Sequence, residues 1–177
     1  MKQQQRKLLK QRRNALSKEE VFRKSQIICE QLKPYLNGTC ALYCAYGNEV
    51  QLDTLFDVCK CVLPIVDNDT DMHFVYYDAS LGYQQGAYQI REQQNASLCP
   101  KEEIDVIIVP LVGFDESLHR IGHGKGYYDR YLQDCKALKI GVAYEVQKLE
   151  QIEVDQHDIS LDMIMSEQQI YQKCGSQ

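Results

Sequence analysis

The feature of this chain that most constrains its fold is the order of three segments in residues 104–135. Residues 104–109 read Ile-Asp-Val-Ile-Ile-Val, a density of β-branched side chains typical of a central parallel strand. A glycine-rich loop follows, and residues 127–135 predict a helix. Because strands that alternate with helices form parallel sheets covered by helices, this order favours an α/β sandwich with a mostly parallel sheet.

The remaining segments extend the same pattern. Residues 2–16 predict a basic, polar helix, and Ser17-Lys18-Glu19-Glu20 is a capping box that opens a second helix ending near Pro34. Further elements alternate along the chain: strands at 39–46, 61–66, 72–77, 139–144 and 161–165, and a short helix at 52–59. Residues 78–103 are polar and irregular, and we expect a mobile segment over a binding cleft. No repeat or linker divides the chain, so we predict one domain, residues 1–177.

Composition narrows the class of protein. A net charge of −5 argues against a general nucleic-acid binder, and no apolar run approaches the roughly 20 residues that span a bilayer. The N-terminus lacks the apolar segment of a secretory signal, so we expect a cytoplasmic protein, and we expect a monomer. The chain has eight cysteines, Cys174 among them. They form no C-x-x-C pair, and no pair of histidines follows a cysteine at the spacing of zinc ligands. We therefore predict reduced, structural thiols rather than a zinc site.

The glycine-rich loop is the main candidate for chemistry. Gly122, Gly124 and Gly126 alternate with other residues just after Arg120, and Lys125 stands between the last two. Glycine lets backbone amides approach an anion closely. The predicted helix behind the loop would direct its free N–H groups at the same anion. Asp129 lies one turn into that helix, where a carboxylate could hold phosphate-bound Mg²⁺. The loop fits neither the dinucleotide fingerprint nor the P-loop, so an ordinary turn is the alternative, but the pattern favours a nucleotide-using enzyme.

A second segment should reach the same place. Ligands in such sheets lie beyond the carboxyl ends of the strands. The stretch Cys44-Ala45-Tyr46-Gly47-Asn48-Glu49 leaves one predicted strand, and residues 110–120 leave the central one. Both can therefore line one crevice.

Taken together, these pieces resemble the 5-formyltetrahydrofolate cyclo-ligase family, also called 5,10-methenyltetrahydrofolate synthetases, over nearly the whole chain. The motifs that carry the resemblance are Lys2-x-x-x-Arg6, Glu49, Phe114-Asp115, Arg120-Ile-Gly-His-Gly-Lys-Gly-Tyr-Tyr-Asp-Arg130 and His157-Asp158. The resemblance implies a three-layer α/β/α sandwich shared with certain sugar-phosphate isomerases and CoA transferases. It also implies ATP- and Mg²⁺-dependent ring closure of 5-formyltetrahydrofolate, with or without a polyglutamate tail, to 5,10-methenyltetrahydrofolate.

The family's pattern assigns roles to positions of this chain. Arg120 and Lys125 would stabilise the transferring phosphate, and Asp129 and Asp158 would hold Mg²⁺. Residues that would contact the nucleotide are Lys2, Arg6, Arg120, Gly122, His123, Gly124, Lys125, Gly126, Tyr127 and Tyr128. Residues that would contact the folate are Cys44, Tyr46, Glu49, His123 and Tyr127, with Glu49 accepting paired N–H bonds from the pterin. Each residue also has a structural alternative: a solvated charge, a helix cap, a core position or a variable loop position.

Two departures from the family's pattern are Leu111 and Leu118, which stand where glycines are usual and could change the path of the loop. They leave open a catalytically silent protein that binds folate or nucleotide. A sugar-phosphate isomerase on the same fold is a further alternative. Lys2, Arg6 and Asp129 argue against it, because isomerisation has no use for a metal-held triphosphate.

Overall fold

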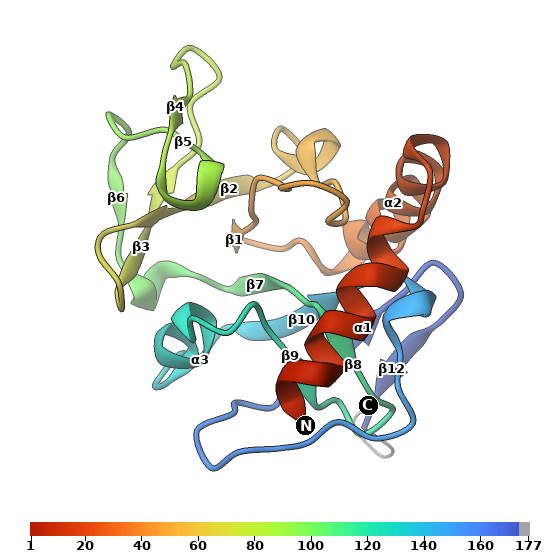
Figure 1. The fold of residues 1–177 in the computed structure, drawn as a ribbon. Helices are drawn as coiled ribbons and strands as arrows, with labels where there is room; N and C mark the ends of the chain where they lie inside the picture. Colours follow the sequence, from red (N-terminus) through yellow and green to blue (C-terminus); the bar gives the residue numbers. More distant parts are fainter. Residues whose placement is uncertain (174–177) are drawn as a thin grey trace.

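The computed structural model describes residues 1–173 and forms an α/β fold built on one large sheet (Figure 1). The order of strands in the sheet is β12-β11-β10-β7-β1-β2-β3-β6. Their bounds are β1 Thr39–Ala41, β2 Lys60–Val66, β3 Met72–Tyr76, β6 Leu98–Cys99, β7 Val106–Pro110, β10 Leu138–Val142, β11 Met163–Met165 and β12 Ile170–Gln172. The five inner strands from β11 to β2 run parallel, whereas β12, β3 and β6 pair antiparallel at the two edges.

Strand β7 shows why the sheet lies between two helical layers. Val106 and Ile108 face one hydrophobic core, and Ile107 and Val109 face the other. All four side chains are buried, as expected for a strand with no solvent-facing side. The predicted mostly parallel central sheet is therefore confirmed.

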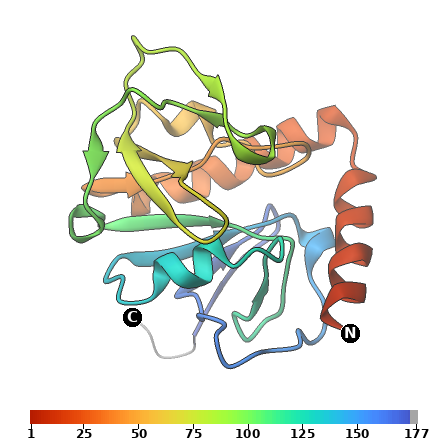
Figure 2. The same ribbon diagram turned by 60° about the vertical axis from the view of Figure 1, so that its left-hand side comes forward.

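The helices cover opposite faces of this sheet (Figure 2). Helix α2 (Lys18–Leu32) begins at a capping box, in which Ser17 Oγ accepts from the Glu20 amide and the Glu20 carboxylate accepts from the Ser17 amide, as the sequence predicts. It buries Val21, Ile28 and Leu32 in one core. Helix α3 (Tyr127–Leu132) contributes Leu132 to the other.

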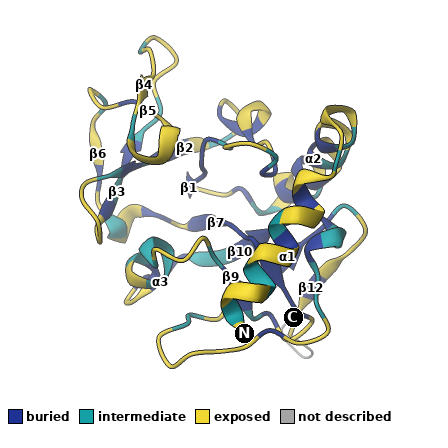
Figure 3. Ribbon diagram, viewed as in Figure 1, coloured by how far each residue is buried: buried dark blue, intermediate teal, exposed yellow. Residues whose placement is uncertain are grey.

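Helix α1 (Lys2–Asn14) lies across the carboxyl ends of the parallel strands. Its lysines, arginines, glutamines and leucines are strong helix formers. Only Leu9 and Arg13 are buried, and most of its outer face is exposed, in contrast to the buried central strands (Figure 3). Two small hairpins complete the fold: β4 (Gln84–Gln85) with β5 (Arg91–Glu92), and β8 (Gly113–Phe114) with β9 (Arg120–Ile121).

Several predicted elements are shorter in the structure. The strand predicted at 39–46 ends at Ala41, and the helix predicted at 52–59 is only a 3₁₀ turn, Asp53–Leu55. Helix α3 stops at Leu132 rather than residue 135, because Gln133 is extended and Asp134 adopts a φ of 58°. The strand predicted at 139–144 begins one residue earlier and ends two residues earlier, as β10. The strand predicted at 161–165 begins two residues later, as β11. Residues 78–103, predicted as irregular, contain β4, β5 and β6.

The seven described cysteines are free thiols, and all but Cys59 are buried, while Cys174 lies outside the described residues. Among those residues, no helix is long and apolar enough to cross a bilayer.

Candidate active site

A pocket of about 500 Å³ opens at the carboxyl ends of the parallel strands. Val66 at the end of β2 and Pro110 at the end of β7 line it, together with residues of α1 and of the glycine loop. Every residue predicted for the site lines it: Lys2, Arg6, Cys44, Tyr46, Glu49, Arg120, Gly122, His123, Gly124, Lys125, Gly126, Tyr127, Tyr128, Asp129 and Asp158. A smaller cavity of about 330 Å³ against α2 contains none of these residues.

The glycine loop adopts the conformations that its sequence suggests. Gly124 and Gly126 have φ values of 101° and 73°, in the region that only glycine enters freely. The guanidinium of Arg6 lies against the loop, with Nε donating to the carbonyl oxygen of Gly122 at 2.9 Å. A Cβ on Gly124 would contact the Arg6 guanidinium at 3.4 Å. The loop and α1 therefore form one continuous wall.

Arg120 is the most buried cation of this wall, with 6% of its surface exposed. Its Nη2 donates to Asp129 Oδ1 at 2.8 Å. Its Nε is buried and has no hydrogen-bond partner among the described residues. Because a buried charged donor without a partner is costly, this guanidinium is poised for an anion from a ligand.

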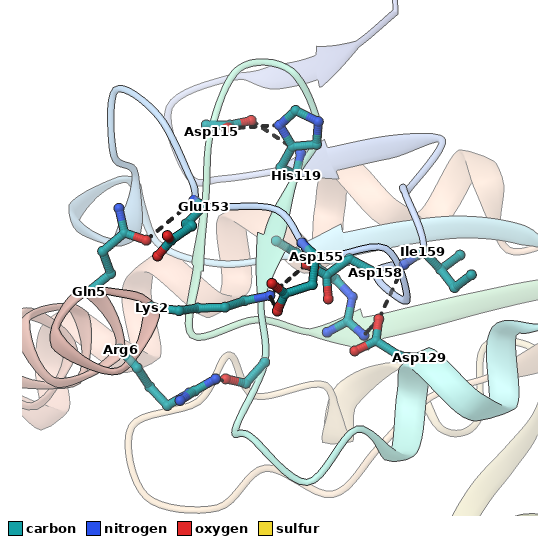
Figure 4. A network of polar contacts seen from close by, with 12 residues as sticks. Lys2, Gln5, Arg6, Asp115, His119, Asp129, Glu153, Asp155, Asp158 and Ile159 are labelled. Carbon is teal, nitrogen blue, oxygen red and sulfur yellow. Dashed lines mark hydrogen bonds and ion pairs between the residues drawn. The ribbon is translucent and has the colours of Figure 1, made fainter.

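Lys2 and the C-terminal loop meet at the end of the same wall (Figure 4). The Lys2 ammonium contacts Asp158 at 2.5 Å and Asp155 at 3.0 Å. Partial burial opposes the charge on both partners, but the hydrogen bonds outweigh it. The pKa of Asp158 is therefore lowered, by the Asp155 amide and Lys2, and the pKa of Lys2 is raised by Asp158 and Asp155. Asp129 joins this corner, since its Oδ1 accepts from the amide of Ile159 at 3.3 Å.

Glu49, in the segment that follows β1, forms a second wall of the pocket and is 7% exposed. Its Oε1 accepts from the Tyr46 amide at 2.8 Å, and its Oε2 lies 3.3 Å from His123 Nε2. His123 thus links the carboxylate to the glycine loop. Cys44 is buried beside this wall, and burial raises the pKa of its thiol to about 11, so it stays protonated at neutral pH.

The tyrosines of the loop belong partly to the protein interior. Tyr127 and Tyr128 both pack against the core on the α3 side of the sheet, and Tyr127 also donates to the carbonyl oxygen of Asn68 at 2.7 Å. Burial raises the pKa of Tyr128 well above its usual range. Lys125 is exposed, with its ammonium 5.8 Å from the ring centre of Tyr88.

Ten further residues line the pocket and were not predicted, among them Lys10, Tyr88 and Asp155. Lys10 follows Arg6 by four residues, so helical spacing could have found it. Asp155 precedes Asp158 by three residues. Tyr88 lies in a 3₁₀ turn, Ala87–Gln89, whose approach to the loop has no sequence signal.

Comparison with known proteins shows which family the chain belongs to. A sequence model described as the 5-formyltetrahydrofolate cyclo-ligase family matches residues 1–167, nearly the whole chain. The chain belongs to the 5-formyltetrahydrofolate cyclo-ligase family. Membership makes it an enzyme of the folate cyclo-ligase class.

Individual relatives of this cyclo-ligase family match over most of their length. The chain is 34% identical to a 5-formyltetrahydrofolate cyclo-ligase of Mycoplasma pneumoniae, over 92% of this chain and 96% of the relative. It is 29% identical to the cyclo-ligase of Mus musculus, over 90% of each chain. Two solved 5,10-methenyltetrahydrofolate synthetases share the fold. The Aquifex aeolicus structure has a TM-score of 0.87 and 31% identity, covering 99% of this chain and 94% of that one. The Mycoplasma pneumoniae structure has a TM-score of 0.78 and 32% identity, covering 94% and 98%.

Proposed function

We propose that this cyclo-ligase closes the ring of 5-formyltetrahydrofolate to 5,10-methenyltetrahydrofolate and consumes ATP with Mg²⁺. The observation that carries the proposal is the buried Nε of Arg120, which lacks a partner in the described part of the chain and lies in the pocket that also contains Glu49. A phosphate oxygen would supply that partner, and the pterin edge would supply N–H donors to Glu49.

The formyl group is a poor electrophile, so its oxygen must first be turned into a leaving group. The formyl oxygen forms a bond to the γ-phosphorus of ATP as the bond from that phosphorus to ADP breaks. Folate N10 then donates its electron pair to form a bond to the formyl carbon, and the carbon–oxygen bond breaks. Phosphate leaves with the electron pair of that carbon–oxygen bond, and the N10 proton is released. Phosphoryl transfer depends mainly on positioning and on neutralising charge. Arg120, Lys125, Lys2 and Arg6 supply the cations, and the amides of the glycine loop supply neutral donors.

Asp129 and Asp158 fit a magnesium site. Both carboxylates line the pocket, and in the described residues Asp129 Oδ2 and Asp158 Oδ1 make no hydrogen bond. No group of three or more histidine, cysteine or acidic residues in residues 1–173 could hold a metal alone. One or two carboxylates with phosphate oxygens suffice for Mg²⁺, which would neutralise phosphate charge.

The test measures methenyl product by its absorbance, with purified protein, 5-formyltetrahydrofolate, ATP and Mg²⁺. Product that requires both ATP and Mg²⁺ supports the proposal. Calorimetry with a nonhydrolysable ATP analogue gives a second readout. Binding of both ligands without product would instead support the catalytically silent protein.

A further inference from the structure

Lys10 is a pocket cation that the proposed function leaves without a role. Lys10 lines the pocket, yet its ammonium makes no hydrogen bond or ion pair with any residue in the described part of the chain. The two other cations of α1 that line the pocket do have protein partners. Lys2 pairs with Asp158, and Arg6 bonds Gly122.

The helix places Lys10 in the same wall of the pocket as Arg6. Lys10 follows Arg6 by four residues, so both lie on one face of α1, about 6 Å apart along its axis. Arg6 contacts the glycine loop, and His123 of that loop reaches Glu49. Lys10 lines the same pocket as Glu49, and the charges of both Arg6 and Glu49 act on it.

The charges around Lys10 favour the arrival of an anion. Partial burial lowers the pKa of Lys10, and the nearby guanidinium groups of Arg13 and Arg6 lower it further, while Glu49 only partly opposes them. Arg13 is itself 6% exposed, and its Nε and Nη1 have no partner among residues 1–173. This end of α1 thus carries excess positive charge that faces one carboxylate.

We propose that the Lys10 ammonium contacts the formyl oxygen of the folate and the phosphoryl group that it accepts. The inference rests on the proposed function, because the nucleotide and the pterin would meet between Arg6 and Glu49. As the new oxygen–phosphorus bond forms and ADP departs, the phosphoryl oxygens gain a fixed cation beside the reacting carbon. The same cation stabilises the phosphate as the carbon–oxygen bond breaks.

The test compares Lys10→Met, which removes the charge at similar length, with Lys10→Arg, which keeps it. The matched control is Lys7→Met, an exposed lysine of the same helix outside the pocket. We expect Lys10→Met to lower kcat by roughly 100-fold, the scale of losing one transition-state donor. Calorimetric binding of 5-formyltetrahydrofolate and of a nonhydrolysable ATP analogue should change by less than about threefold. Lys10→Arg should recover most of the rate, and Lys7→Met should behave as wild type.

Other outcomes decide against the inference. A wild-type kcat in Lys10→Met would overturn it, as would a higher KM for polyglutamylated folate alone, which would assign Lys10 to the glutamate tail. If Lys10→Met does not fold, Lys10→Gln takes its place, and equal kcat losses in the arginine and glutamine variants would indicate a merely structural role. Absence of product from the wild-type protein would sink the proposed function itself, whereas an active wild type with an active Lys10→Met sinks only the role of Lys10.

Discussion

The two walls of the pocket hold their charges in different ways. In the wall formed by the glycine loop and α1, Arg120 and Lys2 are paired with Asp129 and Asp158. The Nε of Arg120 still has no partner among the described residues, so a ligand can bind there without displacing a carboxylate. In the second wall, Glu49 is held by one amide and one histidine and has no lysine or arginine partner among the described residues. Under the proposed function, the first wall would offer N–H donors to phosphate oxygens, whereas the second would offer a carboxylate to the N–H donors of the pterin.

Among the substitutions in the two walls, removal of the Arg120 guanidinium should lower turnover the most. We expect Arg120→Ala to lower kcat by about 100- to 1000-fold, because transition-state charge loses a buried donor. Thermal unfolding should show that the variant still folds, and Arg12→Ala, at an exposed cation of α1, is the control. Wild-type turnover in Arg120→Ala would remove this residue from the chemistry.

Neutralising Glu49 should affect the other wall alone. Glu49→Gln keeps the shape and an oxygen for the Tyr46 amide but loses a charge-assisted bond. The KM for 5-formyltetrahydrofolate should rise about 10- to 100-fold, the range of a hydrogen bond to a charged group. Calorimetric binding of the ATP analogue should stay unchanged, and exposed Glu150→Gln is the matched control. A parallel loss of nucleotide binding would show that the two walls are not independent.

Asp129 and Asp158 allow a finer test within the wall formed by the glycine loop and α1. Asp129→Asn should raise the Mg²⁺ concentration for half-maximal rate roughly tenfold, the scale on which changes around a metal site act. The control is Asp134→Asn, at an exposed aspartate whose left-handed backbone asparagine also tolerates. An unchanged Mg²⁺ titration would place the ligand elsewhere.

The smallest effect on turnover should come from a substitution at Cys44, which lines the same pocket as Glu49. A thiol with a pKa of about 11 stays protonated as pH rises through the ordinary cysteine range, so it adds no negative charge to this pocket. We expect the ratio of Cys44→Ser to wild-type kcat to stay constant between about pH 7 and 9, where ordinary thiols ionise. The pH–rate profiles of both proteins test this. An inflection near the usual thiol pKa in the wild type alone would contradict it.

Sequence reasoning was most successful where the pattern is local or the motif is specific. The capping box at Ser17 and the β-branched run of β7 each depend on neighbouring residues, and both formed as predicted. Strand β12 was missed because its three residues are held by pairing with β11 rather than by their own pattern. The roles assigned to the pocket residues remain predictions.

Leu118 shows how the structure resolves a departure from the family's pattern. It stands where a glycine is usual and adopts a φ of 68°, while its side chain is buried at 1% exposure. The left-handed conformation costs an ordinary residue roughly 1–2 kcal/mol. Burial of a leucine side chain contributes about 1.5–3 kcal/mol, enough to offset that cost. Leu111, the second departure, is also buried and packs close to Gly141.

By itself, the sequence determined the layered α/β class, the capped second helix and the glycine loop between its cations, since each is encoded by residues close together in the chain. Only the tertiary structure decided that His123 meets Glu49, that Lys2 pairs with Asp158, and that Lys10 has no partner in residues 1–173. His123 and Glu49 are 74 positions apart in the sequence, and Lys2 and Asp158 are 156 positions apart. Such contacts depend on how α1 packs across the strand ends, which no local pattern specifies.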